Sequence, residues 1–139
     1  MIIDCSSTAD RVPVVADAAC LEVSLVFPFD GEDSWLKDGA EAAREWLRAA
    51  YQAPLNAAGV PPSGVGEAGR LADAVRAIRM AAWQYETNPI VYAFAVGSYL
   101  IRYASYADNG TLDRRAVAYA LACRLFAGIA EHCEPRAAA

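Results

Sequence analysis

The chain contains residue types that carry chemistry, but few of them stand at the spacings that a reaction needs. Residues 64–69 read GVGEAG and match the Gly-x-Gly-x-x-Gly pattern of dinucleotide-binding turns. That pattern needs a strand directly before it. The preceding AGVPPS contains two prolines, which a buried strand excludes. We therefore expect a helix to begin here and no nucleotide to bind.

His132 is the only histidine, and Cys133 follows it directly. Adjacent residues of a helix do not face each other, so the two do not form a nucleophile and its base. An imidazolium is favoured in the last turn of a helix, which indicates a structural role for His132. The sequence also lacks the Glu-x-x-His pair of di-iron bundles and the Gly-x-Ser-x-Gly turn of hydrolases. We expect no enzyme activity, no cofactor and no metal.

Acidic residues are concentrated between residues 30 and 45. The spacing does not match a calcium loop, which needs acids at alternate positions followed by glycine. Acids before and within a first helical turn ordinarily compensate the helix dipole, and their side chains are solvated. The alternative is a docking patch for a basic protein partner. Its candidate residues are Asp30, Glu32, Asp33 and Asp38.

Length and charge restrict the class of protein. A chain of 139 residues predicts one domain over 1–139, with loose tails at 1–10 and 134–139. The net charge of −5 makes nucleic acid an unfavourable partner. Eleven of the twelve basic residues are arginine and alanine is abundant, a composition that suggests a high-GC bacterial genome or its phage.

Cysteine usage and hydropathy predict a cytoplasmic location. Cys20 and Cys123 lie among apolar residues and are expected to be buried thiols, and no Cys-x-x-Cys spacing occurs. The N-terminus lacks the basic and apolar regions of a signal peptide. The uncharged run 89–101 is shorter than the roughly 20 residues of a membrane span. We therefore expect no membrane segment.

Hydrophobic periodicity predicts an all-α bundle of four to five helices. The expected helices cover about 34–51, 67–86, 89–107 and 112–133, separated by proline- and glycine-rich turns. Residues 12–27 fit either a helix or a short hairpin. A lone hairpin is marginally stable, which favours the helix.

The helix at about 89–107 has two apolar faces and is therefore expected to be the buried, central one. One face consists of Ile90, Phe94, Gly97, Ile101 and Ala104, and we expect it to be the core. The other carries four tyrosines with Val96. Those tyrosines form either a second core layer or a binding surface. The candidate interface comprises Tyr92, Tyr99, Arg102, Tyr103 and Tyr106.

Together these features predict a non-enzymatic protein–protein interaction module. Its class would be an inhibitor, an immunity, anti-defence or regulatory protein, or a small subunit of a complex. Its partner would be another protein, basic in charge if it binds the acidic patch, or a second copy of the chain. The alternative is a helical protein that binds a small molecule or cofactor in an aromatic-lined pocket.

Overall fold

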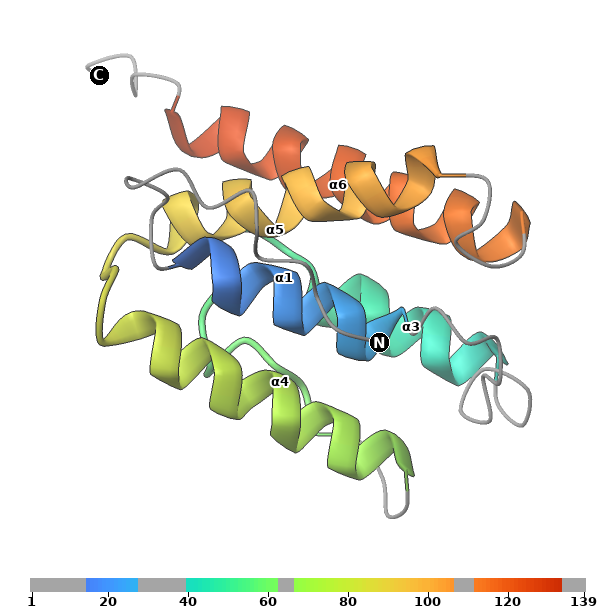
Figure 1. Ribbon diagram of the computed structural model, residues 1–139, viewed down its shortest axis with the longest axis horizontal. Helices are drawn as coiled ribbons and strands as arrows, with labels where there is room; N and C mark the ends of the chain where they lie inside the picture. The colour runs from blue at the N-terminus through green and yellow to red at the C-terminus, as the bar shows by residue number, and fades with distance from the viewer. Residues whose placement is uncertain (1–14, 28–39, 63–66, 107–111, 134–139) are drawn as a thin grey trace, which may run out of the picture.

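The computed structural model describes residues 15–27, 40–62, 67–106 and 112–133, and the regular structure within them is entirely helical. In these described stretches five helices follow one another: α1 (Val15–Val26), α3 (Ala40–Ala50), α4 (Glu67–Trp83), α5 (Pro89–Ser105) and α6 (Leu112–Cys133). Their axes run roughly along the long dimension of the molecule (Figure 1). The all-α prediction is confirmed, and the segment left open between helix and hairpin is the helix α1.

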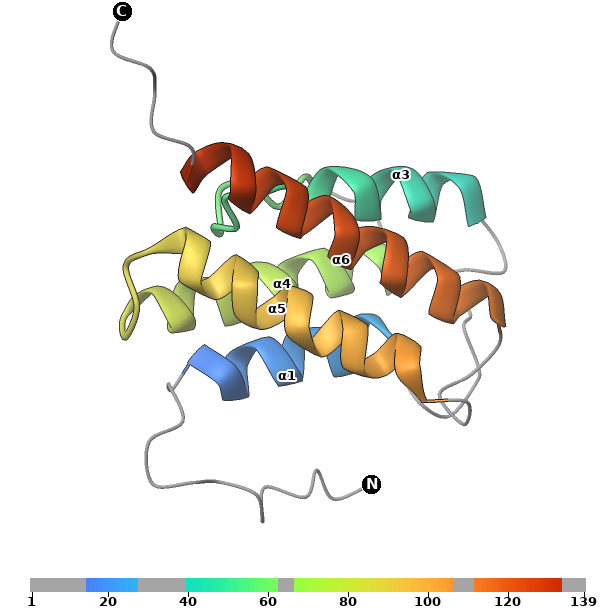
Figure 2. The same ribbon diagram turned by 90° about the horizontal axis from the view of Figure 1, so that it is seen from above.

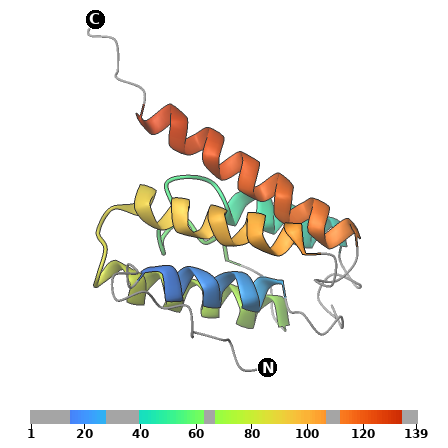
Figure 3. The ribbon, with the colours of Figure 1, turned by 45° about the horizontal axis from the view of Figure 1, so that its top comes forward.

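The helices are arranged in layers. α1 packs against α4 and against α5, and α5 packs against α6. Seen with the top of the molecule turned forward, α1 and α4 lie together at the bottom, α5 lies above them, and α6 crosses over α5 at the top (Figure 3). α3 lies on the far side of α5 from α1 in the view from above (Figure 2). α6 is therefore an outer helix.

The start of α5 follows the local chemistry expected from the sequence. Asn88 precedes the helix in an extended conformation, and its side-chain oxygen accepts a hydrogen bond from the Ile90 amide at 3.0 Å. Pro89 occupies the first helical position, where its missing N–H costs nothing. At the other end the chain becomes extended at Tyr106. These local features set where α5 begins and ends.

Buried apolar residues from all five helices form one cluster. The connection between α3 and α4 contributes to it through Leu55 and Val60, which are both buried. The Trp46 indole N–H donates to the Pro61 carbonyl oxygen at 3.1 Å and ties this part of the connection to α3. The part of this proline-rich connection that contains Leu55 and Val60 thus packs against the core.

α5 faces the core with its tyrosine side, and the prediction that its aliphatic face forms the core is wrong. Tyr92, Val96 and Tyr103 are buried, whereas Phe94 is 58% exposed and Ile101 is also exposed. Of the aliphatic face, Gly97 alone is fully buried. A helical wheel separates two apolar faces but does not say which one the other helices cover.

At Gly97 a side chain of α6 lies directly against the backbone of α5. A Cβ atom at this position would lie 3.0 Å from the tip of the Phe126 ring. The same ring makes an edge-to-face contact with Phe94, with centroids 5.6 Å apart. Glycine therefore makes room for an aromatic side chain between the two helices.

α6 is a long, apolar helix, but little of it is buried in the bundle. Among the described residues it is the one helix that could cross a membrane by length and composition alone, with a mean hydropathy of 1.2 over its 18-residue window. Only 22% of that window is buried in the bundle. Core helices of soluble proteins meet the same criterion. The sequence-based expectation of no such segment considered only the uncharged run in α5.

Candidate functional site

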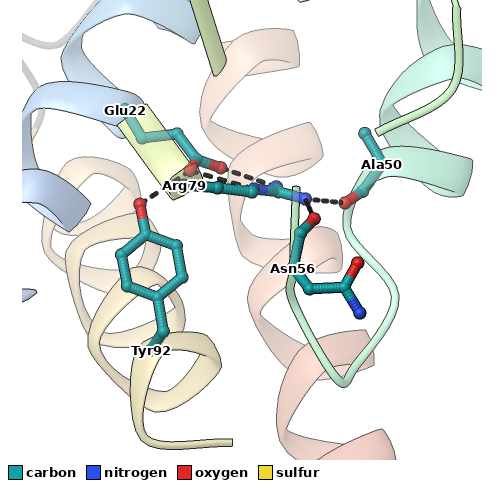
Figure 4. Close-up of polar contacts among 5 residues, drawn as sticks. All are labelled: Glu22, Ala50, Asn56, Arg79 and Tyr92. Atoms are coloured by element: carbon teal, nitrogen blue, oxygen red, sulfur yellow. Dashed lines mark hydrogen bonds and ion pairs between the residues drawn. The ribbon is translucent and has the colours of Figure 1, made fainter. Parts of the chain in front are cut away.

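A buried ion pair lies between α1 and α4. Glu22 is 0% exposed and Arg79 is 3% exposed. The guanidinium binds the carboxylate with two hydrogen bonds, from Nη2 to Oε1 at 2.7 Å and from Nε to Oε2 at 3.1 Å (Figure 4). Two parallel bonds of this kind are among the strongest that arginine makes. Without them, burial of either charge would be strongly unfavourable.

The remaining nitrogen of Arg79 connects the pair to the end of α3. Nη1 donates to the Ala50 carbonyl oxygen at 2.9 Å and lies 3.4 Å from the Asn56 carbonyl oxygen. Carbonyls in the last turn of a helix have no partner within that helix, and a positive charge is favourable there. Arg79 thus links α1, α3, α4 and the connection that follows α3.

Two tyrosines complete the cluster in different ways. The Tyr92 hydroxyl donates to Oε2 of Glu22 at 2.8 Å, which adds α5 to the linked elements (Figure 4). The Tyr51 ring lies under Arg79, with the guanidinium carbon 5.3 Å from the ring centroid, a cation–π geometry. The buried Tyr51 hydroxyl makes no hydrogen bond of good geometry with any described residue.

The electrostatics of the cluster keep both phenols protonated. Burial raises the pKa of Tyr92, and the negative charge of Glu22 raises it further. Burial and the same carboxylate raise the pKa of Tyr51 well above its usual value. For Arg79, burial lowers the pKa, but the Glu22 carboxylate, with smaller contributions from Tyr51 and Tyr92, more than offsets this effect and the pKa is raised.

This arrangement has no group free for proton transfer or nucleophilic attack near neutral pH. The carboxylate accepts three hydrogen bonds, the guanidinium is bound on both sides, and the phenols hold their protons. All four side chains are buried. The cluster therefore acts within the fold: it fixes the helices relative to one another. Within the described part of the chain, no three residues of His, Cys, Asp and Glu come together as they would around a metal ion.

The sequence singled out one partner of this cluster for a different reason. Tyr92 was a candidate interface residue, and the structure places it in the core instead. Glu22 carried no signal beyond one charged residue in an apolar helix, and Arg79 stood among other arginines of α4. A glutamate at a core position of α1 was the available clue, because a buried charge requires a partner.

The candidate interface residues of α5 are divided between core and surface. Tyr103 is buried with Tyr92, and its ring lies 5.2 Å from the ring of Phe27. Tyr99 is half-buried against the core cluster. Arg102 and Tyr106 are exposed. Part of the tyrosine stripe is thus the second core layer that the sequence offered as one of two alternatives.

The other candidates are placed as follows. The acidic patch of Asp30, Glu32, Asp33 and Asp38 lies outside the described residues, as does the start of GVGEAG. The His132 ring is exposed, and its Nδ1–H donates to the Gly128 carbonyl oxygen at 2.7 Å. Cys123, expected to be buried, is exposed. Its apolar neighbours in the sequence do not indicate burial, because α6 has apolar residues on its exposed side as well as on its buried side.

An exposed apolar surface extends over α5 and α6, and the sequence did not predict it. We call it the outer face. Its large side chains are Phe94 and Ile101 on α5 and Leu112 and Tyr119 on α6, and each is exposed. Their exposure follows from the rotation of α5 and from the outer position of α6. Large exposed apolar side chains that gather on one part of a small protein mark a place where another molecule binds.

No protein-family model, curated protein or solved structure matches the chain.

Proposed function

We propose that the chain is a non-enzymatic protein–protein interaction module that acts in the cytoplasm and docks its partner on the outer face. The observation that carries this proposal is the opposite placement of two kinds of residue. The Glu22, Arg79 and Tyr92 side chains of the polar cluster are buried and bound to one another. Large apolar side chains stand exposed instead, Leu112 at 76%, Phe94 at 58% and Tyr119 at 57%.

Aromatic and aliphatic side chains of this size are the usual anchors of protein interfaces. Arg102 and Tyr106, exposed on α5, extend the candidate surface with residue types that are favoured there. The inhibitor, immunity, anti-defence, regulatory and small-subunit classes are all compatible with such a surface. A docking role for the acidic patch is retained in this proposal.

The alternative function, binding of a small molecule in an aromatic pocket, has less support. It needs tyrosine hydroxyls that are free to orient a ligand. The Tyr92 hydroxyl is already bound to Glu22, and the Tyr103 ring packs on Phe27.

Site-specific photo-crosslinking in the native cell tests the proposal. A photoreactive phenylalanine analogue replaces Phe94 in one variant and Arg70, which is exposed on α4, in a matched control. We expect a covalent protein adduct from position 94 and none from position 70. No adduct at position 94, or equal adducts at both positions, would reject the outer face as a docking surface.

A further inference from the structure

Small residues form a continuous seam along the outside of α6. Its members follow one another at alternating intervals of four and three residues, and all are exposed: Ala116, Ala120, Cys123, Ala127 and Ala130. This alternation gives an average repeat of 3.5 residues, the repeat with which two helices pack side by side along a seam. The buried residues of α6, among them Ala118, Leu121 and Leu125, lie on the opposite side. Small side chains allow a second helix to approach closely.

The two edges of the seam differ in character. One edge carries Leu112, Tyr119 and Phe126 at seven-residue intervals, and the Phe94–Phe126 contact continues it onto α5. The other edge carries Val117, Arg124 and Glu131 at the same interval. Arg124 and Glu131 are both exposed and form no salt bridge with any described residue.

The charged edge is complementary to itself in one orientation. In an antiparallel pair related by a two-fold axis, each edge of the seam meets the same edge of the other copy. If the axis passes between Ala127 and Ala130, then Arg124 lies opposite Glu131 of the second copy, and symmetry forms this pair twice. An axis displaced half a heptad toward the N-terminus would instead place Arg124 against Arg124, which is unfavourable.

The same register covers the most exposed part of α5. The axis falls close to Phe126, and Phe94 contacts that ring. A large exposed aromatic side chain would therefore be buried near the centre of the interface, where anchors are most effective. We infer that the partner docked on the outer face around Phe94 is a second copy of this chain, with the C-terminal halves of the two α6 helices antiparallel and Arg124 paired with Glu131 across the two-fold axis. This inference rests on the proposed function.

Charge reversal tests the pairing. Arg124→Glu and Glu131→Arg each place like charges across the axis, and the double swap Arg124→Glu/Glu131→Arg restores opposite charges. Within one helix the two side chains are about 10 Å apart along the axis, so rescue by the swap requires two copies. Arg70→Glu on α4, on the far side of the bundle from α6 (Figure 3), is the control of equal charge change.

Sedimentation equilibrium from about 1 µM to about 1 mM protein covers the affinity range of small interfaces. The mass of the wild type should rise from 14.8 kDa toward twice that value. Each single reversal should weaken the dimer about tenfold, and the swap should return its affinity to within about threefold. Arg70→Glu should have no effect.

The outcomes separate this inference from the proposed function. A wild-type monomer at every concentration overturns the self-association, as does a dimer that is indifferent to Arg124 or is not restored by the swap. If the crosslinker at position 94 then captures a different protein, the interaction module stands and only the identity of its partner is wrong. If it captures nothing, both fail.

Discussion

At the residue scale, the two buried tyrosines beside Glu22 occupy similar surroundings but differ in hydrogen bonding. Tyr92 donates to the carboxylate, whereas Tyr51 has a buried hydroxyl without a partner of good geometry among the described residues. We expect Tyr92→Phe to lower the free energy of unfolding by about 1.5–3 kcal/mol, because it removes a hydrogen bond to a charged group. Tyr51→Phe should change it by less than about 0.5 kcal/mol, or raise it.

Urea unfolding of both variants at neutral pH measures the difference. The two substitutions remove the same atom from buried positions around one ion pair, so each controls for the other. Equal losses of unfolding free energy in the two variants would show that the Tyr92 hydrogen bond to Glu22 does not contribute to stability.

The same tyrosines predict how stability depends on pH. An unfolded tyrosine loses its proton near pH 10, and the pKa values of folded Tyr51 and Tyr92 are raised above that value. Below about pH 10 both states hold the protons, so the stabilisation is complete. Above it the unfolded state binds fewer protons, and the free energy of unfolding falls by about 1.4 kcal/mol per pH unit for each tyrosine.

Urea unfolding between about pH 9 and about pH 11 should therefore show a steep loss of stability, and Tyr92→Phe should make its slope shallower by about 1.4 kcal/mol per pH unit. Phenolate absorbance should show these two tyrosines ionising only as the protein unfolds. A free energy of unfolding that stays level through this range would contradict the raised pKa values.

At the element scale, the contact between α5 and α6 depends on the missing side chain of Gly97. Valine at this position would meet the Phe126 ring, which a Cβ already approaches to 3.0 Å. We expect Gly97→Val to lower the free energy of unfolding by about 1–3 kcal/mol through overpacking. Ser98→Val, on the exposed side of the same helix, is the matched control and should change it by less than about 0.5 kcal/mol.

Thermal and urea unfolding give the comparison. A double variant, Gly97→Val/Phe126→Ala, should lose less stability than the two single effects added together, because the shorter side chain vacates the space. If the losses of the two single variants simply add in the double variant, then the contact of the valine with Phe126 does not cause the loss of stability in Gly97→Val.

The elements show what the sequence could and could not predict. The start of α5 was predictable because Asn88 and Pro89 act locally, and the end of α3 followed from the prolines beyond it. The choice of core face on α5 was not, because both faces are apolar. It depends on Glu22, 70 residues earlier in the chain, which binds the Tyr92 hydroxyl. Pairing over such a separation leaves no trace in local periodicity.

The candidate site was predicted less well than the fold for the same reason. Residue type alone marked the tyrosines of α5 as special, but it did not distinguish a hydroxyl bound to a buried carboxylate from one exposed to a partner. The exposed seam of α6 was hidden because alanine suits either a core or a surface position. Only the position of α6 at the outside of the bundle shows which of the two applies.

At the scale of the whole molecule, α6 could either cross a lipid bilayer or pack on the helical bundle. Its 22 residues are long enough to cross a hydrocarbon core of about 30 Å. However, Arg124 would lie near the middle of the membrane, at a cost of about 2.5–3.5 kcal/mol. Insertion would also separate Leu121 and Leu125 from the core that they share with α5. Alanine, the main residue of the exposed seam, contributes little to offset these losses.

We therefore expect the folded protein to remain in solution when it is floated with phosphatidylcholine vesicles. Arg124→Leu removes the charge but leaves the packing of α6 on the bundle in place, so this variant should also stay in solution if packing alone is sufficient. Flotation of the variant but not of the wild type would assign the barrier to Arg124. Flotation of the wild type would contradict both arguments and make α6 a membrane-binding helix instead of the outer helix of a soluble bundle.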